Sequence, residues 1–237
     1  MTKPIKVLFI STSNDKMGDS AEKTGLWMEE LAAPYYIFKE AGAYLTIASP
    51  LGGPVPVDPK SESIITVTRS SKRFRNDIEA MNHLSRSIPL LDVRSDQYDL
   101  LFIAGGHGAM WDLAANPLLK QLVEHFNAKN KPVGVICHGV AALLNVMEGK
   151  DKLWLKGKTI TAFSNSEEES AGMAQLLPFL LETRLKELGA TYTSGANYTK
   201  HVVETGNVIT GQNPASAEEV AKLTLNLIRP TFTVIRK

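Results

Sequence analysis

The sequence predicts an α/β fold in which an open, mainly parallel sheet is covered by helices on both faces. Short, continuous apolar runs of strand length alternate with segments whose apolar residues recur at helical spacing. Continuous apolar runs are typical of parallel strands, because helices bury both faces of such strands. The 237 residues are 43% hydrophobic and show no internal repeat or linker, so we expect one domain over residues 1–237.

The N-terminal part predicts a strand, a helix and a second strand. Ile5–Ser11 is an apolar run closed by polar residues, as a buried strand should be. Gly25–Ala41 predicts a helix, because its apolar residues are three or four positions apart: Trp27, Leu31, Tyr35 and Phe38. Pro34 lies within this pattern, and we expect it to bend or break the helix. Tyr44–Ala48 predicts the second strand.

The segment Pro50–Asp96 departs from the alternation, and we expect a lid-like insertion rather than part of the sheet. Pro50–Lys60 holds four prolines and two glycines and predicts a loop, whereas Ser71–Ser85 predicts a charged, mostly exposed helix. Long excursions are often functional, so we expect this one to supply walls of a substrate pocket. We also expect a protein lacking Ser61–Ser85 to fold.

The alternation resumes at Tyr98–Ala104, a predicted strand that ends in a cluster of glycines. Asn116 followed by Pro117 is typical of a helix start, a capping residue before proline at the first helical position. The later predicted elements are helix Pro117–Ala128, strand Pro132–Ile136, helix Gly139–Met147, strand Lys158–Ala162, helix Glu167–Leu188, strands His201–Glu204 and Asn207–Thr210 around a Thr-Gly turn, and helix Pro214–Ile228.

Composition and charge exclude several classes of function. With 26 basic and 25 acidic residues the net charge is +1, which gives no electrostatic footprint for nucleic acid or an anionic membrane. No apolar run approaches the roughly 18 residues of a membrane span, and no signal-peptide core follows the N-terminus. The one cysteine excludes an internal disulfide and points to a reducing compartment. We therefore expect a cytoplasmic protein without nucleic-acid or membrane partners.

Cys137 is the strongest candidate for a catalytic nucleophile. An apolar strand ends directly at this residue, and His138, Gly139 and a small-residue helix follow. A strand–turn–helix elbow exposes the residue at its tip, at the strand end where α/β sheets bind ligands. A free cysteine is more often buried and inert. The position of Cys137 at a strand end, before His138 and Gly139, favours a nucleophile instead. The following helix N-terminus favours a thiolate, so we expect a depressed pKa for Cys137.

The glycine turn Gly105–Gly108, with His107 inside it, is the second candidate feature. Its backbone N–H groups can face a ligand closely, so it suits either a phosphate loop or an oxyanion hole. A plain tight turn is the third interpretation. The dinucleotide-binding fingerprint requires a glycine where Trp111 stands, which argues against that particular use.

Glu30 is the third candidate. It lies three residues after Trp27 and next to Leu31, on the apolar face of the predicted helix, whereas Glu29 points outward. A carboxyl buried in an apolar face either pairs with a polar or charged group or has its pKa raised by desolvation. Carboxyls with a raised pKa serve as acid–base groups. The alternative is a glutamate at the rim of a misplaced helix face.

Other polar residues give weaker signals. The carboxylates Glu167–Glu169 open a predicted helix, where they are expected simply to complement the helix dipole. The five histidines show no metal-ligand spacing, and one cysteine cannot build a thiolate zinc site. We therefore expect no metal and no other cofactor.

Taken together, the motifs resemble the ThiJ/PfpI superfamily, in its glyoxalase III and heat-shock-chaperone branch. The matching motifs are Lys23-Thr24-Gly25 with Glu30, Gly105-Gly106-His107-Gly108, Cys137-His138-Gly139, and Thr210 to Ser216 (TGQNPAS). The resemblance runs from about Lys6 to Ile228. It implies a flavodoxin-like, doubly wound fold of the class I glutamine amidotransferase-like group and a homodimer.

The resemblance also implies roles for these residues. Cys137 would be the nucleophile, and the Glu30 carboxyl would hydrogen-bond its sulfur. His138 would be the third member, oriented across the site by Glu168. The backbone N–H groups of Gly106 and His138 would form the oxyanion hole.

The implied reaction converts methylglyoxal or another 2-oxoaldehyde to the 2-hydroxy acid without glutathione, through a hemithioacetal on Cys137. Other possibilities are a cysteine hydrolase, meaning a peptidase, an amidotransferase-like enzyme or a protein deglycase, and a stress-responsive holding chaperone. The amidotransferase pattern of His-x-Glu is absent, since two residues separate His201 from Glu204.

Overall fold

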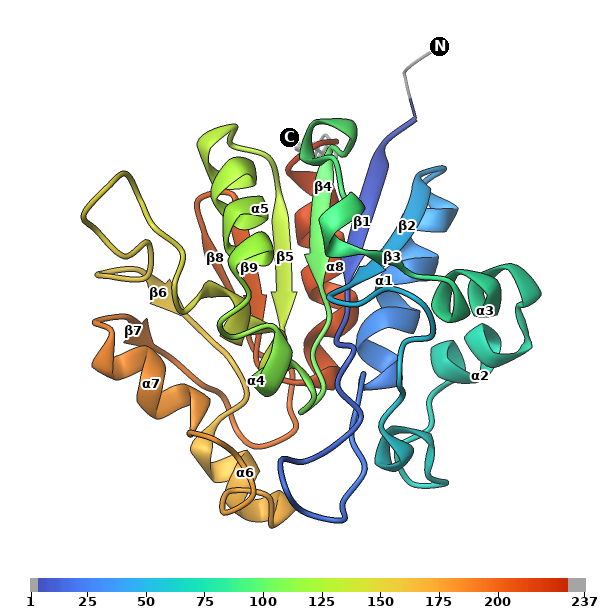
Figure 1. Ribbon diagram of the computed structural model, residues 1–237, viewed down its shortest axis with the longest axis horizontal. Helices are drawn as coiled ribbons and strands as arrows, with labels where there is room; N and C mark the ends of the chain where they lie inside the picture. The colour runs from blue at the N-terminus through green and yellow to red at the C-terminus, as the bar shows by residue number, and fades with distance from the viewer. Residues whose placement is uncertain (1–3, 230–237) are drawn as a thin grey trace, which may run out of the picture.

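The computed structural model describes residues 4–229 and confirms the predicted α/β fold class. Seven strands form one sheet in the order β3-β2-β1-β4-β5-β9-β8, and within it only β8 runs antiparallel to its neighbour (Figure 1). The central order β2-β1-β4-β5-β9 is the flavodoxin-like arrangement, in which ligands bind at the carboxyl ends of the strands. The strands of this sheet are β1 (Lys6–Ile10), β2 (Tyr44–Ser49), β3 (Ile88–Pro89), β4 (Leu100–Ile103), β5 (Val133–Ile136), β8 (Val202–Thr205) and β9 (Val208–Gly211).

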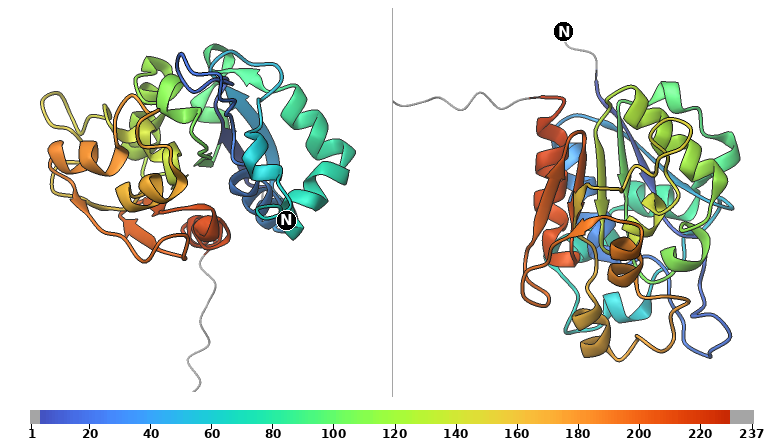
Figure 2. Two further views of the ribbon diagram at one scale, coloured as in Figure 1. Left: turned by 90° about the horizontal axis from the view of Figure 1, so that it is seen from below. Right: turned by 90° about the vertical axis from the view of Figure 1, so that its left-hand side faces the viewer.

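Helices cover both faces of the sheet, as Figures 1 and 2 show. Helices α1 and α8 pack against each other on one face, and α5 covers the other. The helices are α1 (Met28–Glu40), α2 (Arg69–Asn76), α3 (Ile78–Ser85), α4 (Ala109–Asp112), α5 (Pro117–Ala128), α6 (Asn165–Ala171), α7 (Leu181–Glu187) and α8 (Ala217–Asn226). Short 3-10 helices are η1 (Pro59–Glu62), η2 (Leu90–Asp92), η3 (Ser95–Gln97), η4 (Cys137–Leu143) and η5 (Pro214–Ser216).

The central strands are buried apart from Lys6 at the start of β1, as their apolar runs predict. In β1, β4 and β5, Val7, Phe102 and Val135 have no exposed surface. Of the two expected effects of Pro34, a break does not occur: α1 continues through this residue to Glu40 and buries its apolar face. Within the described residues, no helix is both long and apolar enough to cross a membrane.

The segment 50–96 contributes both a strand to the main sheet and side chains to the hydrophobic core. Ile88–Pro89 forms the edge strand β3 and pairs in parallel with β2, so the expectation that this segment lies outside the sheet is wrong. The predicted helix Ser71–Ser85 is two helices, because Asp77 takes an extended conformation and caps α3 with its side chain. These helices bury Phe74 and Leu84, so a deletion of Ser61–Ser85 would remove core side chains, which argues against its tolerance.

Replacing Phe74 by alanine should lower the free energy of unfolding by about 3–5 kcal/mol, because a fully buried phenyl ring leaves a cavity. The ring packs edge-on against Tyr35 at 5.0 Å between centroids. Urea unfolding would measure the change. Ile78→Ala is the matched control, because Ile78 is 81% exposed and its loss should cost less than about 0.5 kcal/mol. Equal unfolding midpoints for the two variants would show that the segment is not part of the core.

The segment 158–198 also differs from its prediction. The long helix expected over Glu167–Leu188 is two short helices, because Gly172 ends α6 in the left-handed conformation and Pro178 precedes α7. The strand expected at Lys158–Ala162 does form as β6 (Thr159–Ile160). It pairs with β7 (Thr191–Tyr192) in a separate two-stranded sheet. The chain from β6 to Tyr198 thereby lies beside the carboxyl ends of the main strands (Figure 1).

Candidate active site

A cavity of about 720 Å³ lies where β4, β5 and β9 end. Residues directly after these strands line it, including Gly106, Cys137 and Pro214. The segment 50–96 contributes Lys60, Ile65, Thr66 and Thr68, so the expectation that it supplies cavity walls is confirmed. The opposite wall comes from the segment 158–198, which also curves around this end of the sheet in Figure 2.

Cys137 forms the predicted elbow directly after β5. Its backbone lies in the left-handed region at φ 55°, a conformation that costs a residue with a side chain about 1–3 kcal/mol. The helix expected from Gly139 is a 3-10 helix that begins at Cys137 itself, and the backbone N–H of His138 donates to the sulfur. The strained turn therefore holds Sγ at the cavity floor, where the side chain is buried but lines the cavity.

Glu30 lies in the first turn of α1 with no exposed surface, as its place on the apolar face predicts. Its Oε2 accepts a hydrogen bond from Gly105 N–H at 2.8 Å. The carboxyl also hydrogen-bonds the Cys137 thiol, as the resemblance implies, and its Oε1 has no other partner among the described residues. The glycine turn therefore fixes one oxygen of a carboxyl that faces the sulfur at the cavity floor.

The glycine turn after β4 packs tightly under the start of α1. Gly106 has φ 97°, and a Cβ there would lie 2.2 Å from the carbonyl oxygen of Gly25. Gly105 N–H is used by Glu30, but Gly106 N–H donates to no acceptor in the part of the chain that the structure describes. The turn thus presents a free donor on the cavity wall, beside Cys137.

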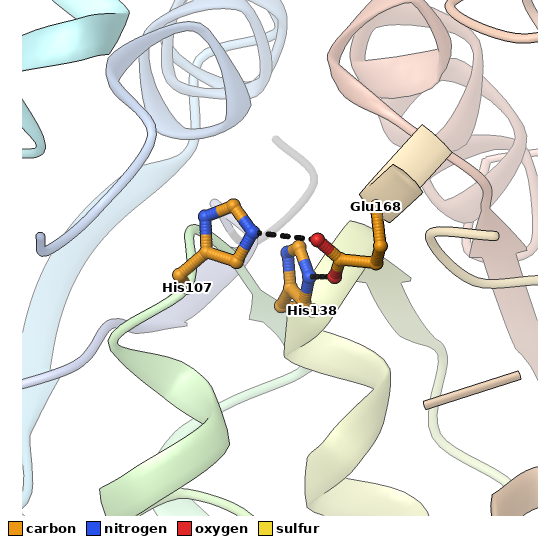
Figure 3. A group of neighbouring side chains, drawn as sticks. All are labelled: His107, His138 and Glu168. Atoms are coloured by element: carbon orange, nitrogen blue, oxygen red, sulfur yellow. Dashed lines mark hydrogen bonds and ion pairs between the residues drawn. The ribbon is translucent and has the colours of Figure 1, made fainter. Parts of the chain in front are cut away.

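Glu168 bridges two imidazoles, as Figure 3 shows. His138 Nε2 lies 2.5 Å from Oε1 of Glu168, and His107 Nε2 lies 3.0 Å from Oε2. A carboxylate only accepts hydrogen bonds, so both nitrogens carry protons. His138 Nδ1 is then an acceptor, and it lies 3.3 Å from Cys137 Sγ. Three of the residues implied by the resemblance, Cys137, His138 and Glu168, are therefore brought together in one chain of hydrogen bonds.

The pKa values of this chain favour a neutral imidazole on a carboxylate. Burial lowers the pKa of His138, and the neighbouring His107 lowers it further. Burial alone would raise the pKa of Glu168, but the two imidazoles outweigh it and the pKa falls to about 2. At neutral pH Glu168 is therefore ionised and His138 is able to accept a proton at Nδ1.

His107, His138 and Glu168 also form the one group among residues 4–229 that could hold a metal ion, with ligand atoms within 4.8 Å of one another. The spacing of histidines along the sequence gives no sign of this cluster. Metal bonds of about 2.0–2.1 Å at tetrahedral angles require ligand atoms roughly 3.3 Å apart. The 2.5 Å contact between His138 and Glu168 is much shorter. The spacing is that of a hydrogen-bonded group rather than of a prepared metal site.

The expected depression of the Cys137 pKa is wrong. Burial raises the pKa of the thiol, and the Glu30 carboxyl raises it further, which together outweigh the His138 N–H. Burial likewise raises the pKa of Glu30 to about 8, although its contacts with Cys137 and Gly105 oppose the rise. At neutral pH the resting pair is therefore a thiol beside a protonated carboxyl.

The expectation that Glu29 points away from the site is also wrong. Glu29 is half-buried, lines the cavity and accepts a hydrogen bond from the Thr68 hydroxyl of the segment 50–96. Burial raises the pKa of its carboxyl. The helical wheel separates Glu29 from the core but cannot show a neighbouring segment folding over it.

Glu167 is a buried residue whose role the sequence does not reveal. It was expected only to complement the helix dipole, but its carboxylate accepts hydrogen bonds from four other residues: Ser164 N, Tyr198 N, Gln212 Nε2 and Asn213 Nδ2. These partners tie the start of α6 to the motif after β9. Glu167 therefore fixes the helix turn from which Glu168 reaches the two histidines.

The contribution of Glu30 to the free energy of unfolding should fall as pH rises from about 5 to 8. Glu30 binds a proton up to about pH 8 when folded but only to its ordinary value of 4.5 when unfolded. The folded state then holds more protons than the unfolded state across this window, so raising the pH favours unfolding. Urea midpoints of wild type and Glu30→Gln at pH 5 and pH 8 measure this, and the wild type should lose more stability. Parallel pH dependence in both proteins would contradict it.

Comparison with known proteins relates most of the chain to one family. The family model described as DJ-1/PfpI family matches residues 23–227. Glutathione-independent glyoxalase hsp3102 of Schizosaccharomyces pombe is 29% identical over 219 residues, which cover 87% of this chain and 90% of that protein.

Two solved structures are similar over nearly their full length. Rapid Encystment Protein 24 KDa of Francisella tularensis aligns with a TM-score of 0.90 and 39% identity, covering 94% of this chain and 99% of that one. Glyoxalase III from Candida albicans aligns with a TM-score of 0.87 and 25% identity, covering 94% and 97%. The sheet order, the cysteine elbow and the match over residues 23–227 agree, and the chain belongs to the DJ-1/PfpI family.

Proposed function

We propose that the protein converts methylglyoxal or a related 2-oxoaldehyde to the 2-hydroxy acid without glutathione, with Cys137 as the nucleophile. One observation carries this proposal, the fully buried Glu30 carboxyl beside the Cys137–His138–Glu168 chain of hydrogen bonds. A cysteine hydrolase needs a nucleophile, a base and an oxyanion hole. A second acid–base group at the sulfur is surplus to hydrolysis, but a 2-oxoaldehyde requires one, because a proton must move between two carbons. The names of the yeast relatives support the same reaction.

The first step is addition of the Cys137 sulfur to the aldehyde carbon. His138 Nδ1, 3.3 Å from Sγ, takes the thiol proton, and the Glu168 carboxylate stabilises the imidazolium that forms. Because the resting group is a thiol, the nucleophile forms during the attack. The aldehyde oxygen becomes an oxyanion, and the Gly106 and His138 N–H groups stabilise it until it is protonated.

The second step moves a proton from the former aldehyde carbon to the neighbouring carbonyl carbon through an enediol. We assign this transfer to Glu30, which lies beside the sulfur and whose pKa of about 8 suits an acid–base group near neutral pH. Protonated Glu30 first gives its proton to the hemithioacetal oxyanion. The resulting carboxylate then removes the proton from the former aldehyde carbon and returns it to the neighbouring carbon. The product is a thioester of the 2-hydroxy acid on Cys137. Water then cleaves the thioester, which restores the thiol, so that one water is consumed per turnover. Gly105 holds Glu30, and His107, fixed by Glu168, forms the adjoining cavity wall.

The test is incubation of the purified protein with methylglyoxal in the absence of glutathione, followed by chromatographic measurement of lactate. We expect lactate to account for the methylglyoxal consumed, and a chelator to leave the rate unchanged, because the histidine cluster lacks metal spacing. Hydrolysis of amide or ester substrates without any lactate formation would replace this proposal by the hydrolase alternative.

We further propose a homodimer that resides in the cytoplasm. The single free cysteine suits a reducing compartment, and the resemblance to the glyoxalase III branch implies the dimer. Light scattering of the purified protein would test the dimer directly.

A further inference from the structure

The cavity is much larger than methylglyoxal requires. Methylglyoxal has five non-hydrogen atoms and occupies on the order of 100–150 Å³, on the scale of roughly 30 Å³ per water. The cavity holds about 720 Å³, within the roughly 300–1,000 Å³ typical of sites for much larger ligands. Most of the space would remain unfilled when the two carbonyl groups of methylglyoxal sit at Cys137.

The space beyond the reacting groups is enclosed mainly by apolar side chains. Glu30, Cys137 and His138 lie together at the buried end, whereas the walls toward the opening are Trp27, Ile65, Phe163, Met173, Tyr198 and Pro214. Phe163 is 6% exposed and stacks beside the His138 ring, with 4.8 Å between centroids. An apolar surface therefore begins directly at the catalytic group and continues outward.

The charges at the opening disfavour an anionic ligand. Glu29 and Glu218 both line the cavity, and Glu218 contributes to raising the pKa of the Glu29 carboxyl, so the two are near enough to interact. Lys60 is the one cation on the cavity wall among the described residues, and it lies 3.4 Å from the Glu22 carboxylate. A ligand with a negative group at this end would face two carboxylates and a lysine that is already paired.

From the cavity volume, its apolar walls and this charge pattern, we infer that the preferred substrate is a 2-oxoaldehyde bearing a large, uncharged apolar group, such as an alkyl chain of four or more carbons or an aryl ring. The dicarbonyl end sits at Cys137 and Glu30, and the apolar group lies along Phe163 toward Ile65. This inference rests on the proposed function and names its substrate class.

A homologous series of 2-oxoaldehydes, from methyl to hexyl, tests the inference by comparison of kcat/KM. Complete burial of a methylene corresponds to about a fourfold gain. Since the cavity is open at one end, we expect a smaller gain per carbon and a pentyl-to-methyl ratio of about 10–100. An analogue of similar length ending in a carboxylate should lose most of this gain. The unhydrated aldehyde fraction of each compound is measured separately and used to correct the rates.

Ile65 and Ile64 provide a matched pair of variants. Ile65 lines the cavity, Ile64 is its neighbour outside the lining, and the two are 91% and 94% exposed, so neither substitution should affect folding. Ile65→Asn should lower the pentyl-to-methyl ratio about three- to tenfold, because it places a polar group against the alkyl chain. Ile64→Asn should leave the ratio as in wild type.

The outcomes separate this inference from the proposed function. Turnover of methylglyoxal with a ratio that stays flat or falls with chain length overturns the inference and leaves the proposed function standing. Equal effects of the two isoleucine variants also overturn the assigned position of the chain. Failure to convert any member of the series overturns the proposed function, and the inference with it.

Discussion

Replacing Cys137 by serine should lower kcat/KM for methylglyoxal by at least about 10⁴-fold, with the fold retained. A serine hydroxyl is a much weaker nucleophile than a thiol, and removal of one member of a catalytic group that acts as a unit costs nearly the whole rate. The elbow backbone at φ 55° is unchanged, because serine has the same backbone constraints as cysteine. Lactate formation under pseudo-first-order conditions measures the loss.

The chain contains one cysteine, so no other thiol can substitute for Cys137 in this experiment. Circular dichroism and urea unfolding serve as the controls for folding. Retention of more than about a tenth of the wild-type rate, in a protein with a native spectrum, would contradict the assignment of Cys137 as nucleophile.

Replacing Glu30 by glutamine should lower the rate by about 10²–10⁴-fold, the range that a positioned acid–base group contributes. Glutamine keeps an acceptor for Gly105 N–H but cannot transfer a proton between the two carbons. The wild-type kcat/KM should also fall as pH rises through about 8, because Glu30 loses its proton there. Steady-state rates between pH 6 and 9 measure both effects, and the residual rate of the variant should lack this limb of the profile.

Glu40→Gln is the matched control, since Glu40 lies on the same helix but is exposed and paired with Arg73 at 2.6 Å. Its rate should equal that of wild type. If Glu30→Gln retained wild-type turnover, the proton transfer would have to be assigned to His138 instead.

The sequence predicts the groups that directly follow central strands. Cys137 and the turn at Gly105 each follow a continuous apolar run, and such runs mark buried parallel strands with little ambiguity. Glu30 could be found because helical periodicity places it on the apolar face of its helix. Its complete burial confirms that assignment.

The remaining side of the site depends on contacts between distant segments. Glu168 lies on a short helix that the sequence pattern predicts as part of a longer one. It contacts His107, which lies 61 positions earlier in the chain. Glu167 is buried among partners that include Gln212 and Asn213, 45 and 46 positions away, which no local pattern shows. The raised thiol pKa has the same origin, because the helix terminus is visible in sequence while the extent of burial is not.

The central claim is that turnover requires the sulfur of Cys137, and alkylation tests it most directly. The protein is treated with iodoacetamide for increasing times, and each sample is divided between intact-mass measurement and the lactate assay. Because the chain has a single cysteine, the added mass that Cys137→Ser does not acquire under the same treatment reports modification of Cys137. We expect lactate formation to fall in proportion to the alkylated fraction and to reach zero when every Cys137 is alkylated. Lactate formation that persists in fully alkylated protein would contradict it.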